Sequence, residues 1–338
     1  MEHVYSMAAD SRRASRVELR QPHPGLLEFE LAAVAPEPPG PGEVTVQVFA
    51  AGLNFPDLLT AIGLSAAYFE DPPRPGLECA GVVVAAGPGV TEFEAGARVV
   101  GVVEGAFAST VNVPATSVMP VPDHMDFAQA ATLPVAFLTA WYGLVRQAGV
   151  RRGERLLIHS AAGGVGSAAL AIARLRGAEV LATAGTDEKR KHLRELGVRH
   201  VMDSRSPDFG DETMAATGGE GVDVVLNSLT GEMLRRGLEL LRVRGRFVEI
   251  GKRDIMADSA LGLAPFRNSL SLHSVDLRLL ISHCPDLIGE LLGELAPLFA
   301  AGALAPLPYT PFPVTRADSA FRKMMSGRHI GKIVLTFA

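Results

Sequence analysis

Short apolar runs broken by glycine and proline fill the first third of the chain. Residues 44–49 (VTVQVF) alternate apolar and polar positions at period two, and residues 26–31 alternate in part. The turn-rich string PEPPGPGE lies between them, and two β-branched runs follow, GLECAGVVVAAGPGV and GARVVGVV. Period-two alternation is typical of strands, and closely spaced short strands with glycine between them predict a barrel-like β module.

The pattern changes in the middle of the chain, where short apolar runs alternate with helical stretches. A strand over residues 156–159 precedes a glycine turn and an alanine-rich helix, and a second strand is predicted over 180–184. A charged helix over 187–196 ends at Gly197, and an amphipathic helix over 232–241 separates the buried strands of GVDVVLNSL and GRFVEIGK. Strands that alternate with helices predict right-handed βαβ units and a doubly wound parallel sheet of the Rossmann type.

The last part of the chain is β-like again. Residues 306–314 resemble a strand, 317–325 a helix, and 332–337 (KIVLTF) a terminal strand. A terminal strand needs a sheet to join, and a return to the first module is the simplest topology. The expected fold class is therefore α/β, with the Rossmann domain inserted into a mostly β substrate domain.

Composition and charge exclude several classes of protein. The chain has 338 residues, of which 48% are hydrophobic and 20% charged, as in a globular protein with a large core. The net charge is −5 and the basic residues form no long run, which argues against a nucleic-acid-binding surface. Cys79 and Cys284 are too few for a disulfide framework or a cysteine-rich zinc site, which favours a reducing, cytoplasmic setting.

Neither a secretory signal nor a membrane span is expected. The N-terminal twenty residues carry charges but no apolar core. The longest apolar stretch, residues 128–145, is interrupted by polar residues and proline, whereas a span needs about 20 predominantly apolar residues. We therefore expect no membrane partner.

The glycine turn AAGGVG follows a predicted strand and opens a helix. In the dinucleotide fingerprint the second glycine, here Gly163, lets the backbone approach the pyrophosphate, and the third, here Gly166, allows close helix–strand packing. Ala161 replaces the first glycine. The N-terminus of the helix has unpaired backbone N–H groups and the positive end of the helix dipole, and both favour binding of phosphate groups. An ordinary tight turn is the alternative, but the flanking strand and helix favour a cofactor site.

The residues after the second strand leave the choice of dinucleotide open. Asp187 has the spacing of an acid that binds a ribose 2′-hydroxyl, but it also suits the first turn of a helix. Lys189 and Arg190 would suit a 2′-phosphate. Spacing alone is compatible with NAD and with NADP.

Seven strings, in order along the chain, carry a resemblance to a known family. The chain resembles the zinc-independent medium-chain reductases, specifically the enoylreductase domains of polyketide synthases and of the related animal fatty-acid synthase. The strings are AGLNFPDLL, ECAGVV, PVAFLTAWYGL, HSAAGGVGSAA, GVDVVLNSLTGE, GRFVEIGKRD and RHIGKIVL. The resemblance implies a GroES-like substrate domain. The expected divisions are residues 1–127 (substrate domain), 128–273 (Rossmann domain) and 274–338 (return to the substrate domain).

The same resemblance implies NADPH as the hydride donor. By this resemblance, Lys189 and the Arg205 of DSRSPDF match family positions that hold the 2′-phosphate of NADPH. Other residues match family positions lining the cofactor, in addition to the Gly166 of the glycine turn. They are Asn54, Thr139, Ser160, Gly163, Gly164, Val165, Asn227 and Gly251.

Reduction of an α,β-unsaturated thioester needs a proton donor as well as a hydride. Hydride adds to the β-carbon, and the negative charge that develops on the α-carbon and thioester oxygen must be stabilised and protonated. Lys252 follows a sheet strand in EIGKRD, and a lysine amine is charged at neutral pH. The resemblance identifies Lys252 as the proposed donor and Asp276, in LHSVDLRLL, as the acid acting with it. These are the expected catalytic residues.

Two departures from the family pattern concern metal binding and the stereochemistry of the product. Zinc-binding relatives have G-H-E where this chain has Leu77 between Gly76 and Glu78, so a histidine ligand is missing and no metal site is expected. Ser65 stands where one stereochemical class has tyrosine, with Tyr68 three residues further on. This position implies a 2R product from an α-methyl enoyl substrate.

The expected function is enoyl-thioester reduction on an acyl-carrier protein in polyketide or fatty-acid synthesis. The start within linker-like sequence suits a fragment of a larger synthase, so neighbouring synthase domains are expected partners. The alternatives are a free-standing NADPH quinone or enone reductase and a catalytically silent scaffold. A variant chemistry on the same site, such as ring closure of a halogenated substrate, also stays open.

Overall fold

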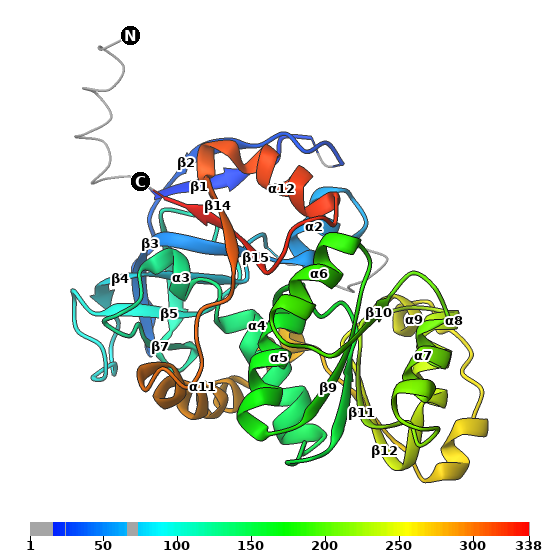
Figure 1. The fold of residues 1–338 in the computed structure, drawn as a ribbon. Helices are drawn as coiled ribbons and strands as arrows, with labels where there is room; N and C mark the ends of the chain where they lie inside the picture. The colour runs from blue at the N-terminus through cyan, green and yellow to red at the C-terminus, as the bar shows by residue number, and fades with distance from the viewer. Residues whose placement is uncertain (1–15, 24, 66–73, 338) are drawn as a thin grey trace.

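Two domains lie side by side in the computed structural model, which describes residues 16–23, 25–65 and 74–337 (Figure 1). An α/β domain occupies the middle of the chain, drawn mainly in green and yellow. A β-rich domain combines the N-terminal strands, in blue and cyan, with the C-terminal strands, in orange and red. The expected insertion of one domain into the other is thus confirmed.

The α/β domain is built on a parallel sheet. Its strand order is β10-β9-β8-β11-β12-β13, and every neighbouring pair is parallel. Each residue of the central strand β11 is buried, as a strand covered by helices on both faces requires. The strands are β8 (Arg155–Ile158), β9 (Glu179–Ala184), β10 (His200–Asp203), β11 (Val222–Asn227), β12 (Leu241–Glu249) and β13 (Ser271–Ser274).

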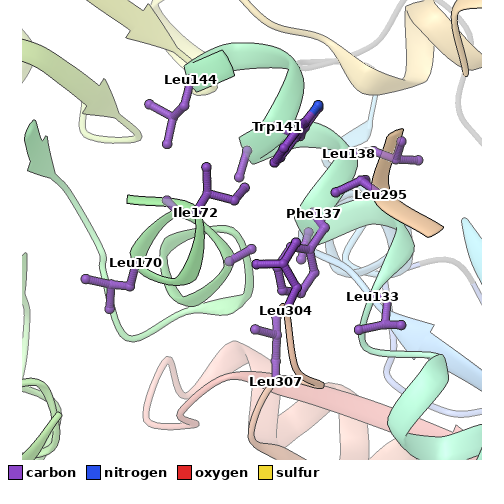
Figure 2. Packing of buried hydrophobic residues seen from close by; sticks show 14 of the residues in the cluster. Leu133, Phe137, Leu138, Trp141, Leu144, Leu170, Ile172, Leu295, Leu304 and Leu307 are labelled. Atoms are coloured by element: carbon purple, nitrogen blue, oxygen red, sulfur yellow. The ribbon is translucent and has the colours of Figure 1, made fainter. Parts of the chain in front are cut away.

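Helices cover both faces of this sheet and link it to the other domain. The helices are α3 (Phe127–Ala130), α4 (Pro134–Trp141), η3 (Tyr142–Gln147), α5 (Gly164–Arg176), α6 (Asp187–Glu195), α7 (Phe209–Ala216), α8 (Glu232–Glu239), α9 (Arg253–Met256), η4 (Ala264–Asn268), α10 (Leu277–His283) and α11 (Pro285–Ala300). Figure 2 shows side chains of α4, α5 and α11, among them Phe137, Ile172 and Leu295, packed into one core. This core fixes the glycine turn that precedes α5.

The most apolar helical region runs through that core. Residues Phe127–Gln147 are long and apolar enough to cross a membrane by length and composition alone, but 72% of the most apolar window is buried inside the protein. Burial of that kind is typical of the core helix of an α/β domain.

The β-rich domain has a mixed sheet of order β14-β15-β3-β4-β5-β7, and β6 pairs with β3. The terminal strand β15 pairs antiparallel with β3, so the predicted return of the chain to its first module is confirmed. The elements are β3 (Glu43–Leu53), α2 (Phe55–Ala61), β4 (Glu78–Ala86), β5 (Arg98–Val102), β6 (Thr110–Pro114), η2 (Ala115–Ser117), β7 (Val118–Pro120), β14 (Tyr309–Pro313), η5 (Val314–Arg316), α12 (Ala317–Met325) and β15 (Lys332–Thr336).

A hairpin of β1 (Arg16–Arg20) and β2 (Glu30–Val34) lies beside α12, and Phe29 before β2 packs against Phe321 of that helix. The strand expected over residues 26–31 is wrong for most of its length. The antiparallel pairing begins at Arg20 and Glu30, so residues 26–29 have no partner strand in the hairpin and form the connection.

Candidate active site

The glycine turn joins β8 to α5 through closely packed backbone. Ser160 has φ +52°, a left-handed conformation that is uncommon for a residue with a side chain and is often found at functional sites. A Cβ on Gly166 would lie 2.5 Å from the Ser160 carbonyl oxygen and 2.6 Å from the Ala161 Cα. Gly166 therefore allows the close helix–strand packing that the fingerprint predicts.

Helix α5 begins without a side-chain cap. Its N-cap is Gly163, and among the described residues no side chain accepts a hydrogen bond at this end. The first-turn amides and the positive end of the helix dipole are therefore suited to phosphate oxygens. Val165 lies in the same turn and is half-buried. These features fit the pyrophosphate of a dinucleotide.

The C-terminal string RHIGKIVL lies against this turn. The Gly331 N–H donates to the Ala162 carbonyl oxygen at 2.8 Å. A Cβ on Gly164 would lie 2.8 Å from Cδ of Lys332, so the lysine stem occupies the space that a side chain there would need. The terminal segment of the substrate domain thus forms part of the glycine-turn site.

The Lys332 ammonium belongs to a buried network beside the turn. Its Nζ lies 2.5 Å from Glu78 Oε1 and 2.6 Å from Asn54 Oδ1. Asn54 Nδ2 donates to the same Glu78 oxygen at 2.8 Å, and the Val135 N–H donates to Glu78 Oε2 at 2.8 Å. The exposed fractions are 0% for Glu78, 4% for Lys332 and 7% for Asn54. The amide of Asn54, predicted to line the cofactor, is thus oriented by an ion pair that the sequence did not reveal.

A second buried carboxyl group adjoins this network. Asp57 accepts backbone hydrogen bonds from Gly76 at 2.7 Å and from Asn54 at 2.8 Å. Burial raises the pKa of Asp57 to about 7, and the two N–H donors partly oppose that rise. Its main contact is with backbone, so it fixes the start of α2 against the segment that leads into β4.

The two residues predicted to hold a 2′-phosphate lie close together. Lys189 in α6 donates from Nζ to the Gly327 carbonyl oxygen at 2.7 Å. Burial lowers the pKa of Lys189, and the nearby positive charge of Arg205 lowers it further. A Cβ on Gly185 would lie 2.9 Å from Nε of Arg205, so both cations border the end of β9. An anion bound between them would relieve their repulsion.

Arg190, which spacing also favoured for a 2′-phosphate, is engaged elsewhere. Its guanidinium lies 2.6 Å from Asp187 Oδ1 and 2.9 Å from Asp203 Oδ2. Asp187 itself is in the first turn of α6, where an acid is favourable. Both residues therefore have structural partners within their own domain.

Lys252 and Asp276 form an ion pair at the carboxyl end of β12. Asp276 Oδ2 contacts Lys252 Nζ, while Oδ1 caps α10 by accepting the N–H groups of Arg278 at 3.1 Å and Leu279 at 3.4 Å. Burial lowers the pKa of Lys252 to about 8, and the charge of Arg278 acts in the same direction. The structure thus brings together the two residues predicted to be catalytic.

The turn before Lys252 is fixed by a buried carboxyl group. Glu249 accepts from Asn227 Nδ2 and from the Gly251 N–H, each at 2.5 Å. Burial raises the pKa of Glu249 to about 7. Asn227 is fully buried, so its amide side chain supports this turn rather than lining open space. The sequence signal for Glu249 is the same as that for Glu78, a single charged residue in an apolar run, and it does not identify the partner.

Two other predicted cofactor residues lie on the elements around the turn. Thr139 is on α4, and its hydroxyl donates to the Val135 carbonyl oxygen at 2.7 Å. The Ser160 hydroxyl accepts from Ser228 at 3.0 Å, which joins the ends of β8 and β11. The carboxyl ends of these strands are where ligands bind in open parallel sheets. The cofactor roles of these residues remain predictions.

An apolar residue occupies the position where zinc-binding relatives have a histidine. Leu77 is buried, between Gly76 and the buried Glu78. Across the described ranges, His, Cys, Asp and Glu side chains do not gather in threes in a way that could hold a metal ion. Cys79 is a buried free thiol and Cys284 an exposed one.

Comparison with known proteins agrees with this architecture. An alcohol dehydrogenase GroES-like domain matches residues 40–123, and a zinc-binding dehydrogenase domain matches residues 196–335. The chain is 46% identical over 333 residues to the phthioceranic/hydroxyphthioceranic acid synthase of Mycobacterium tuberculosis, covering 98% of the chain and 16% of the synthase. It is 44% identical over 333 residues to a mycocerosic acid synthase-like polyketide synthase of Mycolicibacterium smegmatis, again covering 98% of the chain and 16% of the synthase. The chain thus spans a small part of these curated relatives.

Several solved oxidoreductase structures are similar to this chain over nearly its whole length. CurK enoyl reductase has a TM-score of 0.87 at 39% identity, covering 96% of this chain and 99% of that one. The CurF ER cyclopropanase of curacin A biosynthesis has a TM-score of 0.87 at 35% identity, with coverages of 96% and 99%. Escherichia coli quinone oxidoreductase complexed with NADPH has 0.81 at 29% identity, with coverages of 96% and 100%. The chain belongs to the medium-chain dehydrogenase/reductase superfamily of oxidoreductases, in its group of polyketide synthase enoyl reductases.

Proposed function

We propose that the chain is an NADPH-dependent enoyl-thioester reductase that acts on acyl chains carried by an acyl-carrier protein, in polyketide or fatty-acid synthesis. The observation that carries the proposal is the Lys252–Asp276 ion pair at the carboxyl end of β12, on the sheet edge where ligands bind in open parallel sheets. The similarity to CurK enoyl reductase supports the same reaction class.

The cofactor residues would act by fixing a dinucleotide across the carboxyl edge of the sheet. When bound, NADPH supplies the hydride that adds to the β-carbon of the enoyl group. The amides at the start of α5 would hold its pyrophosphate, and Lys189 and Arg205 its 2′-phosphate. Gly166 would keep the helix close enough to the strand for this approach.

Lys252 would complete the reaction by protonating the α-carbon. Its ammonium first stabilises the negative charge that spreads to the thioester oxygen, and then releases a proton to the α-carbon. Burial lowers the pKa of Lys252 to about 8, so it remains mostly charged at neutral pH but gives up its proton readily. Asp276 orients the ammonium, and solvent returns the proton after each turnover.

The test is to follow NADPH absorbance with different acceptors. The crotonyl thioester, attached either to pantetheine or to a carrier protein, should be reduced faster than free crotonate or a simple quinone. Activity on quinones with none on enoyl thioesters would favour the free-standing quinone reductase instead. Binding of NADPH without oxidation by any of these acceptors would contradict enoyl reduction.

Cofactor selectivity gives a second test of the same site. Lys189→Ala or Arg205→Ala should weaken NADPH binding by roughly 10- to 100-fold, because a hydrogen bond to a charged group contributes about 1.5–3 kcal/mol. NADH binding should change little. Lys191→Ala is the matched control, since Lys191 is on the same helix with its side chain 78% exposed. Equal losses for the two cofactors, measured by fluorescence titration, would show that these residues do not read the 2′-phosphate.

The proposal includes partners. Because the curated relatives are much longer than this chain, neighbouring synthase domains and a carrier protein are the partners to expect. We also propose the domain limits given above, with the Rossmann domain over residues 128–273. Separate expression of residues 128–273 and of residues 128–300, followed by circular dichroism, would test the second limit: folding of only the longer segment would move that limit beyond α11, whose Leu295 packs into the same core as Phe137.

A further inference from the structure

Helix α10 is tied to the loop after β5 by the residue two positions after the proposed catalytic acid. Arg278, two residues beyond Asp276, forms an ion pair with Glu104, in which Nε lies 2.9 Å from Oε1. The exposed fractions of the two side chains are 17% and 25%, so both are largely shielded from water. The pair joins parts of the chain that are 174 residues apart. It therefore links α10 to the loop after β5, next to the Lys252–Asp276 pair.

The loop that carries Glu104 is itself well anchored. It follows β5, and the Val103 N–H donates to the Leu77 carbonyl oxygen at 3.1 Å. The Ala106 N–H donates to the Gly76 carbonyl oxygen, also at 3.1 Å. Glu104 thus projects from a loop fixed against the segment that leads into buried Glu78. A rigid acid at this place holds the guanidinium of Arg278 in a defined position.

The position of Arg278 matters because of the charges around Lys252. Its backbone N–H is bound to the same Asp276 carboxylate that pairs with Lys252. A positive charge close to an ammonium disfavours the protonated form, whereas the carboxylate of Asp276 favours it. Of the described residues, Asp276 contacts Lys252, the charge of Arg278 lowers the pKa of Lys252, and Glu104 pairs with Arg278. Glu249, Arg253 and Asp254 lie within three positions of Lys252 along the chain.

We propose that Arg278 is a positioning residue for the proton transfer, whose charge, fixed by Glu104 of the loop after β5, makes Lys252 readier to release its proton. This inference rests on the proposed function, because it gives the proton of Lys252 a role. The lowered pKa of Lys252, to which Arg278 contributes after burial, supports it. A merely structural ion pair would affect stability but would not alter the titration of Lys252.

The test measures the titration of Lys252 directly, in the full chain without cofactor or substrate. The chain has five lysines, so protein labelled with carbon-13 in the lysine side chains gives few signals, and the Lys252 signal is assigned from a Lys252→Arg sample. We expect the Lys252 titration midpoint to rise by about one pH unit in Arg278→Gln, because a neighbouring charge of the same sign is removed. Arg278→Lys, which keeps the charge, should stay close to the native midpoint. Arg267→Gln, at an exposed arginine of η4, should not change it.

The outcomes separate the inference from the proposed function. An unchanged midpoint in Arg278→Gln, or equal shifts in the Gln and Lys variants, would overturn the inference. If the midpoint shifts as expected and the protein reduces enoyl thioesters, the alkaline limit of kcat/KM should rise by the same amount. If the midpoint shifts but the pH profile of enoyl reduction does not follow it, Arg278 affects Lys252 but has no role in proton transfer. If the native protein reduces no enoyl thioester, the proposed function fails even where the titration behaves as expected.

Discussion

Lys252→Ala should lower kcat for reduction of an enoyl thioester by about 10²–10⁴-fold, the usual contribution of a positioned general acid. The variant loses the ammonium that stabilises negative charge on the thioester and the proton for the α-carbon. Binding of NADPH should persist, because Lys189, Arg205 and the start of α5 are on other elements. The effect should therefore appear mainly in kcat and not in the dissociation constant of NADPH, measured by fluorescence titration.

Neighbouring variants identify which property of Lys252 is needed. Arg253→Ala, at the next and exposed position, is the matched control and should retain most of the activity. Lys252→Arg keeps a positive charge but cannot release a proton near neutral pH, so it should recover charge stabilisation without efficient protonation. An unchanged rate in Lys252→Ala would leave the reductase function standing but remove Lys252 as the donor.

Much of the fold follows from the sequence for simple physical reasons. The strands over residues 156–159 and 180–184 are buried on both faces, so their apolar runs are continuous and easy to recognise. The terminal strand is also predictable, because a run such as KIVLTF needs a sheet to join. In contrast, β13 (SLHS) is short and mostly exposed, and such an edge strand has no distinctive pattern. The hairpin strand was expected too early because local alternation does not reveal where β1 ends.

The candidate site was less predictable, because its pairs join distant parts of the chain. Lys252 and Asp276 could be named together only through the family resemblance. The Lys332–Glu78 contact links residues that are 254 positions apart. The only local signal was a single charged residue within an apolar strand, as in ECAGVV and GKIVL, which implies a buried partner without identifying it. The inward-facing amides of Asn54 and Asn227 are likewise set by tertiary contacts.

Breaking the buried Lys332–Glu78 pair should have the largest effect on stability. Lys332→Met should lower the free energy of unfolding by about 3–5 kcal/mol, because it leaves the carboxylate of Glu78 buried without its cation. The measurement is urea unfolding followed by circular dichroism. Lys191→Met is the control, since the Lys191–Glu195 pair is exposed and such pairs contribute about 0–1 kcal/mol.

A double variant distinguishes the effect of an uncompensated buried charge from the effect of the lost hydrogen bonds. In Lys332→Met with Glu78→Gln, the buried negative charge is also removed, and the Gln side-chain oxygen can still accept the Val135 N–H. We expect this double variant to recover most of the stability lost in Lys332→Met, because replacing a whole buried pair is far less harmful than removing one partner. A double variant as unstable as the single one would mean that the hydrogen bonds of the network, among them the one from Lys332 to Asn54, matter more than the uncompensated charge, because Met keeps most of the stem that packs against Gly164.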